Sequence, residues 1–319
     1  MKENFYILGN GNLKAEEKVL RFDSKDGMRR IPVENIRSIN FYGGGNLTTG
    51  ALSLGSKYNI IFNFFGYYGN YIGSYWPKET YFSGDLTIQQ AKLFLDSKKR
   101  LELCNILVNG IKSNMKYFLE KSHIDTNLLD IDLQGDTVEH LMLSEARMRK
   151  QYYKYFDQLL PDEFKIEERI KHPPNNFGNT LISFGNSRLY AELVTQCRYV
   201  SLNPTISFYH SPESSRYSLP LDVSEVFKPY LVDRFILKIL KKQIIKRTDF
   251  HKEGNGILLS ENGRKKFLQE WERWLNEAYF YDKLKRYVSN RELLKIELYK
   301  LTKHFMDIEV YKYFMPWRR

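Results

Sequence analysis

Residues Ser207 to Arg234 read SFYHSPESSRYSLPLDVSEVFKPYLVDR, and this stretch decides how the larger part of the chain is organised. A proline two residues beyond His210 disfavours helix there, so His210 is expected at the end of an extended segment. Pro220 favours the first turn of a helix, where its missing N–H is not needed. Asp222 and Glu225 then share one face of that helix, close to its N-terminus.

This pattern brings one imidazole and two carboxylates together. Oxygen-rich sites of this kind suit Mg²⁺ or Mn²⁺, and the imidazole of His210 favours Mn²⁺. A structural explanation stands beside the metal site, because acidic side chains near a helix N-terminus are favoured by the helix dipole alone. His210 would then be an ordinary loop residue.

A third acid, Glu145, lies far away in the segment LMLSEARMRKQYYKYF. Helical spacing puts Glu145 on the same face as Leu141 and Tyr152, which is expected to contact other protein. A carboxylate on such a face needs a partner or a metal ion. The simpler alternative is a salt bridge with Arg149, four residues further on, which stabilises a helix only slightly.

The length of the chain and the change in residue pattern along it indicate an α+β protein of two domains. The chain has 319 residues, 42% of them hydrophobic, and has no proline between Pro77 and Pro161. Residues 1–85 contain short runs of Ile, Val, Tyr and Phe separated by Gly and Asn, which is typical of strands. We therefore expect a small N-terminal β-sandwich domain at 1–85 and a larger all-helical C-terminal domain at 86–319.

Within these domains the pattern predicts individual elements. The N-terminal region is expected to include one short helix near Thr48–Tyr58. Helical periodicity covers 87–121, Thr137–Leu160, 177–200 and 234–247, and two further helices are expected after residue 260 and at about 289–310. A Gly-bounded turn or hairpin is expected before the first of these two.

Charge is unevenly distributed. Residues 1–85 hold ten Lys/Arg and eight Asp/Glu, whereas residues 86–319 hold the other 39 and 30. A basic surface beside acidic ligands favours a polyanion, nucleic acid first, although many basic proteins bind none. The candidate phosphate contacts in the 234–247 helix are Arg234, Lys238, Lys241 and Lys242, which suit a solvated face equally well. Those at the start of the next helix are Arg264 and Lys265.

Several classes of protein are disfavoured. The two cysteines, Cys104 and Cys197, form no metal or disulfide pattern, which favours a reducing compartment. The N-terminal residues do not resemble a signal peptide, no run is apolar enough to span a bilayer, and no phosphate-binding glycine motif stands between a strand and a helix. A cytoplasmic protein without membrane contact is expected.

Four segments match short known motifs. The segment from Glu145 to Tyr152 is similar to E-G-x-x-A-x-x-Y, and NTLISFG (179–185) to N-x-L-L-S-F-G. Phe208–His210 resembles G-F-L-H, and 221–229 resembles L-D-x-x-E-x-F-R-P. Together these segments resemble the Cas1 family of CRISPR adaptation endonucleases and integrases. Later landmarks include Asp249-Phe250 and 263–265, and the N-terminal region is most similar to the type I-B version. Ala146, Arg149 and Ser207 depart from the family pattern without removing a ligand.

The resemblance implies a divalent metal held by Glu145, His210 and Glu225, with Asp222 as a ligand or in support. It implies a homodimer joined through the N-terminal domains, assembly with the Cas2 protein, possible help from a Cas4-like nuclease, and binding of double-stranded and branched DNA. The aromatic run of the N-terminal domain would suit such a dimer: Phe62, Phe64, Phe65, Tyr67, Tyr68, Tyr71, Tyr75 and Trp76. Arg149 is a further candidate DNA contact.

The expected chemistry is attack of a DNA 3′-hydroxyl on a phosphodiester at the edge of a CRISPR repeat. If water replaces the hydroxyl, the same site cleaves DNA. Two alternatives stay open: a metal-dependent nuclease of branched DNA that does not integrate, and a DNA-binding scaffold without activity. Asp222→Ala is expected to reduce activity less than loss of Glu145, His210 or Glu225.

Overall fold

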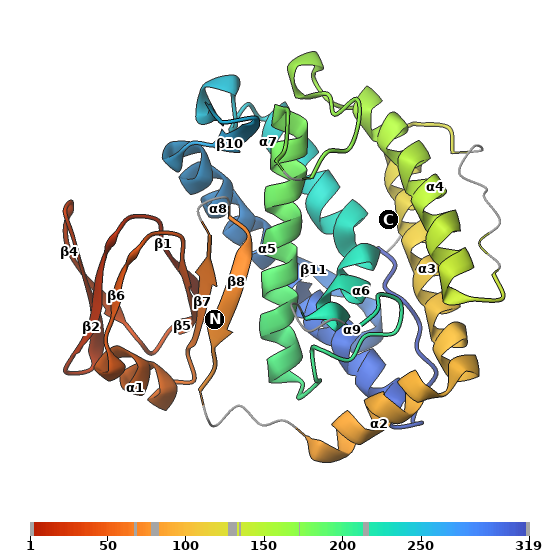
Figure 1. Cartoon of the computed structure of the whole chain (residues 1–319), viewed down its shortest axis with the longest axis horizontal. Helices are drawn as coiled ribbons and strands as arrows, with labels where there is room; N and C mark the ends of the chain where they lie inside the picture. The colour runs from red at the N-terminus through yellow and green to blue at the C-terminus, as the bar shows by residue number, and fades with distance from the viewer. Residues whose placement is uncertain are drawn as a thin grey trace. The chain divides into compact units, whose positions relative to one another are not determined.

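The computed structural model describes residues 3–66, 69–77, 83–126, 133, 135–171, 173–212 and 217–316. The chain divides into two compact units, Met1–Tyr81 and Phe82–Arg319 (Figure 1). This division lies next to the boundary at residues 85 and 86 that the sequence suggests. Each unit is described by itself.

The first unit contains two four-stranded sheets. One has the order β1-β5-β7-β8 and contains β1 (Glu3–Ile7), β5 (Ile36–Phe41), β7 (Ile61–Phe65) and β8 (Tyr71–Tyr75). The other has the order β4-β3-β2-β6 and contains β4 (Gly27–Pro32), β3 (Val19–Ser24), β2 (Gly11–Glu16) and β6 (Gly45–Leu47). The predicted N-terminal β-sheets are thus present.

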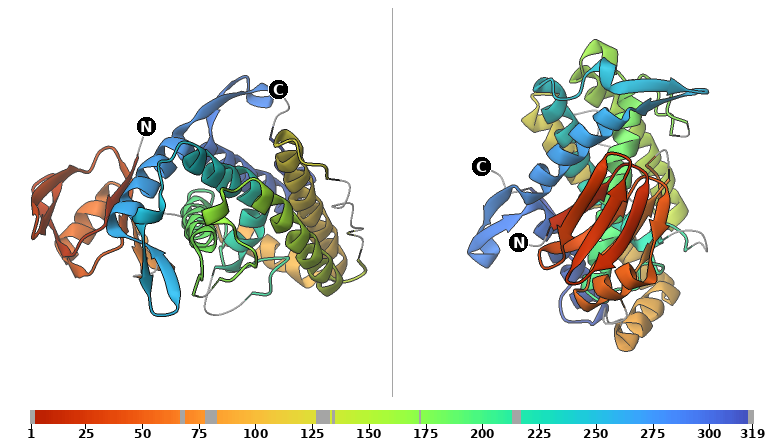
Figure 2. Two further views of the ribbon diagram at one scale, coloured as in Figure 1. Left: turned by 90° about the horizontal axis from the view of Figure 1, so that it is seen from above. Right: turned by 90° about the vertical axis from the view of Figure 1, so that its left-hand side faces the viewer.

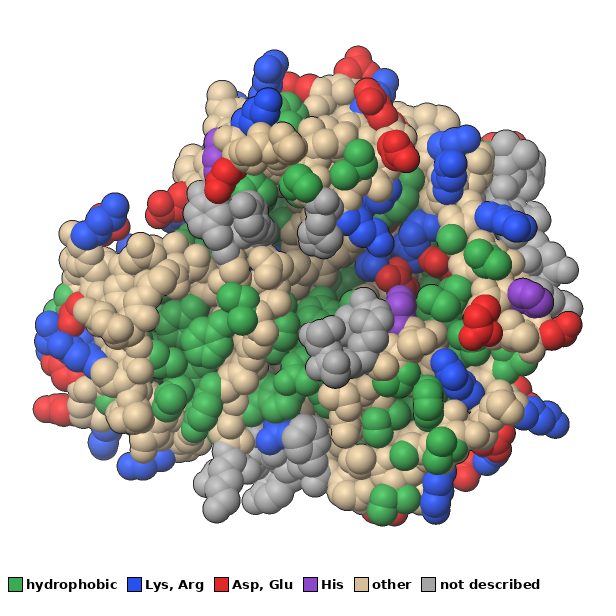
Figure 3. All heavy atoms as spheres, viewed as in Figure 1, with side chains coloured by type: hydrophobic (Ala, Val, Ile, Leu, Met, Phe, Trp, Pro, Cys, Tyr) green, Lys and Arg blue, Asp and Glu red, His purple; other side chains and the backbone are tan. Residues whose placement is uncertain are grey.

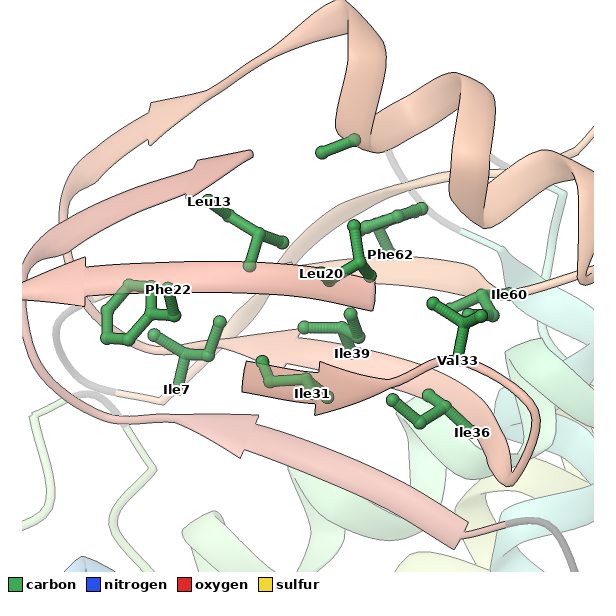
Figure 4. Packing of buried hydrophobic residues seen from close by; sticks show 11 residues of the cluster. Ile7, Leu13, Leu20, Phe22, Ile31, Val33, Ile36, Ile39, Ile60 and Phe62 are labelled. Carbon is green, nitrogen blue, oxygen red and sulfur yellow. The ribbon is translucent and has the colours of Figure 1, made fainter. Parts of the chain in front are cut away.

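Both sheets contribute to one hydrophobic core (Figure 4). Leu13 and Leu20 come from the second sheet, and Ile39 and Phe62 come from the first; all four are fully buried. Alternation along the strands sends these side chains to the inner faces. The predicted short helix is confirmed as α1 (Thr49–Lys57), and the Thr48 side chain caps it by accepting from the Ala51 N–H.

One glycine of this unit has a clear steric role. Gly45 begins β6 with φ 153°, and a Cβ atom there would stand 1.8 Å from the carbonyl oxygen of Gly11. Only glycine therefore lets β6 pair with β2 at this point. The end of the Gly43–Gly45 run thus serves strand pairing, in a segment where the sequence shows no phosphate-loop motif.

The aromatic run proposed for dimerisation is partly internal. Phe62 and Phe65 are 0% and 6% exposed, so they stabilise the core and are not available to a partner. Tyr67 and Tyr68 lie outside the described residues. The prediction failed here because Ile61, Phe62 and Asn63, which point to both faces of β7, are all buried, and the sequence did not show this.

The second unit is mainly helical (Figures 1 and 2). Its α-helices are α2 (Gly84–Leu95), α3 (Ser97–Lys121), α4 (Val138–Gln158), α5 (Phe177–Tyr199), α6 (Ser218–Phe227), α7 (Arg234–Lys241), α8 (Glu261–Asn276) and α9 (Asn290–Phe305). A π-helix, Lys228–Asp233, joins α6 to α7, and three short 3₁₀ turns lie at Asp162–Phe164, Arg247–Asp249 and Asp282–Leu284. Helices α4, α5 and α9 confirm the predicted periodicity.

The all-helical prediction for this unit is wrong. Two antiparallel hairpins lie within it: β9 (Phe250–Glu253) with β10 (Gly256–Leu259), and β11 (Ala278–Tyr281) with β12 (Arg286–Ser289). The first occupies the Gly-bounded segment where a turn or hairpin was expected. The second was missed because its four-residue strands are too short to show a period of two.

Two predicted helices also end earlier than expected. The periodic stretch 87–121 is two helices, because Asp96 leaves the helical conformation and its side chain caps α3 by accepting from Lys99 N–H at 3.0 Å. The helix predicted at 234–247 ends at Lys241. There Gln243 adopts φ 52°, and the Ile244 N–H donates to the Ile239 carbonyl at 3.0 Å, which is a Schellman-type end.

Helix α3 packs against α4 and α6, and α5 packs against α6 and α9 (Figure 1). The segment containing α6 and the π-helix packs against α3 and α5, and its polar side chains meet those of α4. In the part of the chain that the structure describes, no helix is long and apolar enough to cross a membrane.

Candidate active site

His210 is held by the Asp222 carboxylate. Asp222 Oδ1 lies 2.8 Å from His210 Nδ1 and accepts the His210 backbone N–H at 2.9 Å, while Oδ2 accepts the N–H groups of Phe208 and Tyr209 at 2.7 and 2.9 Å. Ser207 Oγ donates to the His210 carbonyl at 2.6 Å. Because Asp222 accepts from the Nδ1–H tautomer, the opposite nitrogen, Nε2, keeps its lone pair for a ligand.

The carboxylates of Glu145 and Glu225 share one guanidinium. Arg149 Nε donates to Glu145 Oε1 at 2.5 Å, and Nη2 of the same arginine contacts both Glu145 Oε1 and, at 2.5 Å, Glu225 Oε2. The contact with Glu225 lacks hydrogen-bond alignment, so that it is a charge contact between two buried atoms. Glu145 comes from α4 and Glu225 from α6, so tertiary packing brings the two acids to a single cation.

Lys228 is the second cation of the site. Its ammonium donates to Glu225 Oε1, three residues earlier. Burial raises the pKa of the Glu225 carboxyl, but the charges of Arg149 and Lys228 outweigh burial and hold that pKa below its usual range. Burial also lowers the pKa of the Lys228 ammonium, against the effect of Glu225.

A third carboxylate, Asp233, lies at the end of the π-helix. It is 2% exposed, and its Oδ2 accepts the Tyr152 hydroxyl at 2.7 Å. Its Oδ1 is buried without a hydrogen-bond partner. Burial raises the pKa of Asp233 to about 6, although the Tyr152 hydrogen bond and the charges of Arg149 and Lys228 oppose the increase.

Helix α4 and the segment from α6 to the π-helix thus face each other through polar side chains. Glu145, Arg149 and Tyr152 share one face of α4 at spacings of four and three. Arg149 meets Glu225 and Tyr152 meets Asp233 across the contact. Figure 3 shows Lys and Arg side chains gathered beside acidic side chains and a histidine, where the second unit is hollowed.

The sequence-predicted ligands fall into two pairs. Asp222 holds His210, while Arg149 holds Glu145 to Glu225. Among the residues that the structure describes, no three His, Cys, Asp or Glu side chains form a group that could hold a metal ion directly. The protein's own cations occupy the space between the carboxylates, so the salt bridge of Glu145 with Arg149 is present, as its alternative reading expected.

Asp222 and Glu225 do not lie at the helix N-terminus as expected. Helix α6 begins at Ser218, so that Pro220 is its third residue and both acids lie beyond the first turn. The helix dipole therefore does not account for them. Each is instead engaged by specific side-chain or backbone donors.

The predicted phosphate contacts divide into exposed and engaged residues. Arg234, Lys241, Lys242 and Lys265 are exposed, and Arg234 also contacts aromatic rings. Arg234 lies over the rings of Tyr230 and Trp274 at 5.4 and 5.6 Å, whereas Lys238 pairs with Glu277 and lies 4.7 Å from the Trp274 ring centroid. Arg264 is half-buried three residues beyond the start of α8. Arg149 is bound to the two acids, so it is not free to contact DNA in this state.

The sequence did not single out Lys228 or Asp233. Lys228 had a signal, because it follows Glu225 by three residues and so shares its helix face. Asp233 had none, because its contact with Tyr152 spans 81 residues and depends on a π-helical turn. Regular α-helical spacing would have placed Asp233 on a different face.

Comparison with known proteins now decides the family. The model of the family "CRISPR associated protein Cas1" matches residues 5–273. The chain belongs to the Cas1 family. The CRISPR-associated endonuclease Cas1 of Methanothermobacter thermautotrophicus is 42% identical over 320 residues, which cover 99% of this chain and 96% of that protein. A Cas1 structure from Thermotoga maritima has a TM-score of 0.89 at 33% identity and covers 99% of this chain and all of its own.

Two more distant structures share the fold of this Cas1 protein. A casposase bound to its integration product has a TM-score of 0.85 at 19% identity, covering 98% of this chain and 93% of that one. A chain of a Cas6-RT-Cas1–Cas2 complex has a TM-score of 0.77 at 17% identity, covering 96% of this chain and 35% of that one. At these identities the likeness concerns the fold.

Proposed function

We propose that this Cas1 protein is a metal-dependent DNA endonuclease and integrase of the type I-B kind. In its main reaction, a DNA 3′-hydroxyl attacks a phosphodiester at the edge of a CRISPR repeat. The observation that carries the proposal is that Glu145 and Glu225 both contact the Arg149 guanidinium, beside His210, whose Nε2 is left for a ligand.

The types of side chain present suit a divalent cation, which would have to replace Arg149 and Lys228 at the carboxylates. Two carboxylates and an imidazole are a ligand set that suits Mn²⁺ or Mg²⁺, and the Glu225 Oε2 atom is buried without a hydrogen bond. Glu145, His210 and Glu225 would hold the cation. The chemistry that it supplies when bound is activation of the attacking oxygen and neutralisation of charge on the phosphate.

The chain's own residues have separate tasks in this proposal. Asp222 fixes the ring orientation of His210 and keeps the Nδ1 proton, so it supports a ligand without being one. Exposed lysines such as Lys241 and Lys265 attract the phosphate backbone. Cys104 and Cys197 are buried, and burial raises the pKa of both thiols, so neither supplies a thiolate nucleophile.

The proposed partners are double-stranded and branched DNA, a second copy of the chain, and the Cas2 protein, with a Cas4-like nuclease as a processing partner. The support is family membership and the basic excess of residues 86–319. For the homodimer, light scattering at micromolar concentration should give twice the mass of the chain. A monomer mass would contradict it.

A strand-transfer assay tests the activity. A donor with a free 3′-hydroxyl and a supercoiled repeat-containing acceptor are incubated with Mn²⁺ or Mg²⁺ and with Cas2. Glu145→Gln and Glu225→Gln should lower the rate roughly a hundredfold or more, since metal activation contributes several kcal/mol. Glu139→Gln, which changes an exposed acid at the start of the same helix, is the matched control.

The outcomes separate the alternatives. Cleavage without strand transfer would indicate a nuclease that does not integrate. DNA binding with no reaction, unchanged by a chelator, would indicate a scaffold. Wild-type strand-transfer rates in folded Glu145→Gln and Glu225→Gln proteins would contradict the proposed site.

A further inference from the structure

One carboxylate of the site has no direct ion pair. Arg149 and Lys228 contact Glu145 and Glu225, whereas Asp233 accepts the Tyr152 hydroxyl and its other oxygen is buried with no hydrogen bond. The charges of Arg149, Lys228 and Arg169 act on Asp233 without such a pair. Because a buried charge without a full set of partners is costly, Asp233 is arranged to accept a cation in direct contact.

The two protein cations hold the carboxylates that are proposed as metal ligands. Arg149 Nη2 contacts an oxygen of Glu145 and an oxygen of Glu225, and Lys228 contacts the other oxygen of Glu225. A divalent cation that binds these oxygens must displace both contacts. Because Arg149 and Lys228 are largely buried, the displaced charges need another acceptor close by.

Asp233 is placed to be that acceptor. The π-helix makes hydrogen bonds five residues apart, as shown by the Arg234 N–H donating to the Pro229 carbonyl, so Lys228 and Asp233 lie one turn apart on one face. The charges of Arg149 and Lys228 both act on Asp233. The Tyr152 hydroxyl occupies Oδ2 and leaves Oδ1 available.

We propose that Arg149 and Lys228 act as internal counter-cations that occupy the site until a divalent cation enters, and that Asp233 then accepts the charge they release. The inference rests on the proposed metal site and adds a mechanism of exchange to it. Asp233 is a positioning residue in this scheme, because it acts through Arg149 and Lys228 and not on the metal ion.

Mn²⁺ binding to the full-length protein without DNA tests the exchange. The free ion is followed by electron paramagnetic resonance during titration. Arg149→Gln should bind Mn²⁺ at least about tenfold more tightly than wild type, because a competing cation is gone, whereas Asp233→Asn should bind it at least about tenfold more weakly, because the released charge has no acceptor. Combining the two substitutions should remove most of the loss seen in Asp233→Asn.

Matched variants control for general effects of charge and fold. Arg147→Gln removes the same charge from an exposed position of α4, and Asp249→Asn removes a buried carboxylate that pairs with Lys266. Both should bind Mn²⁺ within about twofold of wild type. If Arg149→Gln does not fold, Lys228→Gln carries the same expectation.

The outcomes distinguish this inference from the proposed function. If Glu145→Gln abolishes Mn²⁺ binding while Arg149→Gln and Lys228→Gln match wild type, the metal site stands and the exchange is wrong. If Asp233→Asn binds as wild type, Asp233 is not the acceptor. If neither wild type nor Arg149→Gln binds Mn²⁺, both the metal site and the exchange fail.

Discussion

Replacement of Asp222 by alanine is expected to destabilise the second unit strongly. The carboxylate is 1% exposed and accepts three backbone N–H groups and the His210 ring, at 2.7–2.9 Å. Alanine leaves those three N–H groups without their acceptor and removes the link between α6 and residues 208–210. The effect on the fold should then exceed the effect expected of a residue that only supports a ligand.

The size of the effect follows from the contacts. A hydrogen bond to a charged acceptor contributes about 1.5–3 kcal/mol, so the four bonds give an upper limit of roughly 6–12 kcal/mol. Part of this is recovered, since the loop can relax and water can reach its N–H groups. We expect a loss of about 4 kcal/mol in the free energy of unfolding, near the upper end for a single substitution.

Urea unfolding followed by tryptophan fluorescence measures this loss, because Trp271 and Trp274 are buried in the second unit. Asp222→Asn keeps one acceptor oxygen and should lose about half as much. Asp136→Ala, which removes an exposed carboxylate, should stay within about 0.5 kcal/mol of wild type. A free energy of unfolding for Asp222→Ala within about 1 kcal/mol of wild type would refute the structural role given to Asp222.

Three further predictions concern charge. Because the pKa of Asp233 is raised to about 6 from 3.8, its contribution to stability is full below about pH 4 and is lost as pH rises through about 6. Chemical denaturation of wild type and of Asp233→Asn measures this as the difference between their free energies of unfolding. That difference should fall by up to about 3 kcal/mol as the pH rises from about 4 to above 6. A difference that does not change with pH would contradict the raised pKa. Reversal of the exposed Lys241 and Lys242 to Glu should weaken DNA binding and reduce its salt slope by about 2, whereas an unchanged slope would assign both to solvent. Lys238→Glu should also lower the melting temperature, because the new carboxylate would face Glu277. Thermal unfolding measures this against Lys241→Glu, whose exposed position should tolerate the change. Equal melting temperatures of the two variants would contradict the expectation.

Long periodic segments were predictable, and contacts between elements were not. Helix α4 follows from its apolar spacing and the Thr137 cap, and α9 from the Ser289–Glu292 capping box, both of which are local signals. Strands β11 and β12 lack such signals. The meeting of Glu145 with Glu225 depends on packing between distant helices, so the sequence indicated the acids as candidates but not the cation they share.

The sequence singled out His210 and Asp222 by an argument that differs from the contacts in the structure. The sequence placed Asp222 at a helix start, where the helix dipole would account for it. In the structure, Asp222 instead accepts backbone N–H groups of residues 208–210. Hydrogen bonds from backbone N–H groups cannot be predicted from residue types, because every residue except proline carries such a group. The same limit applies to Asp233, whose hydrogen bond to Tyr152 gives no spacing pattern.

The π-helix at Lys228–Asp233 has a consequence for how insertions and deletions are tolerated in this chain. A π turn contains one residue more than an α turn, so deleting one residue between Phe227 and Arg234 would allow α6 to run on into α7 as a regular helix. If Lys228 and Asp233 are both kept, they would then be four residues apart in an α-helix, which again places them on one face. Such a deletion can therefore preserve helix content, hydrophobic composition and the facing of Lys228 and Asp233 together. In a sequence alignment, a one-residue gap at this position would mark an α-helical version of the segment and would not by itself mean that the charge arrangement is lost.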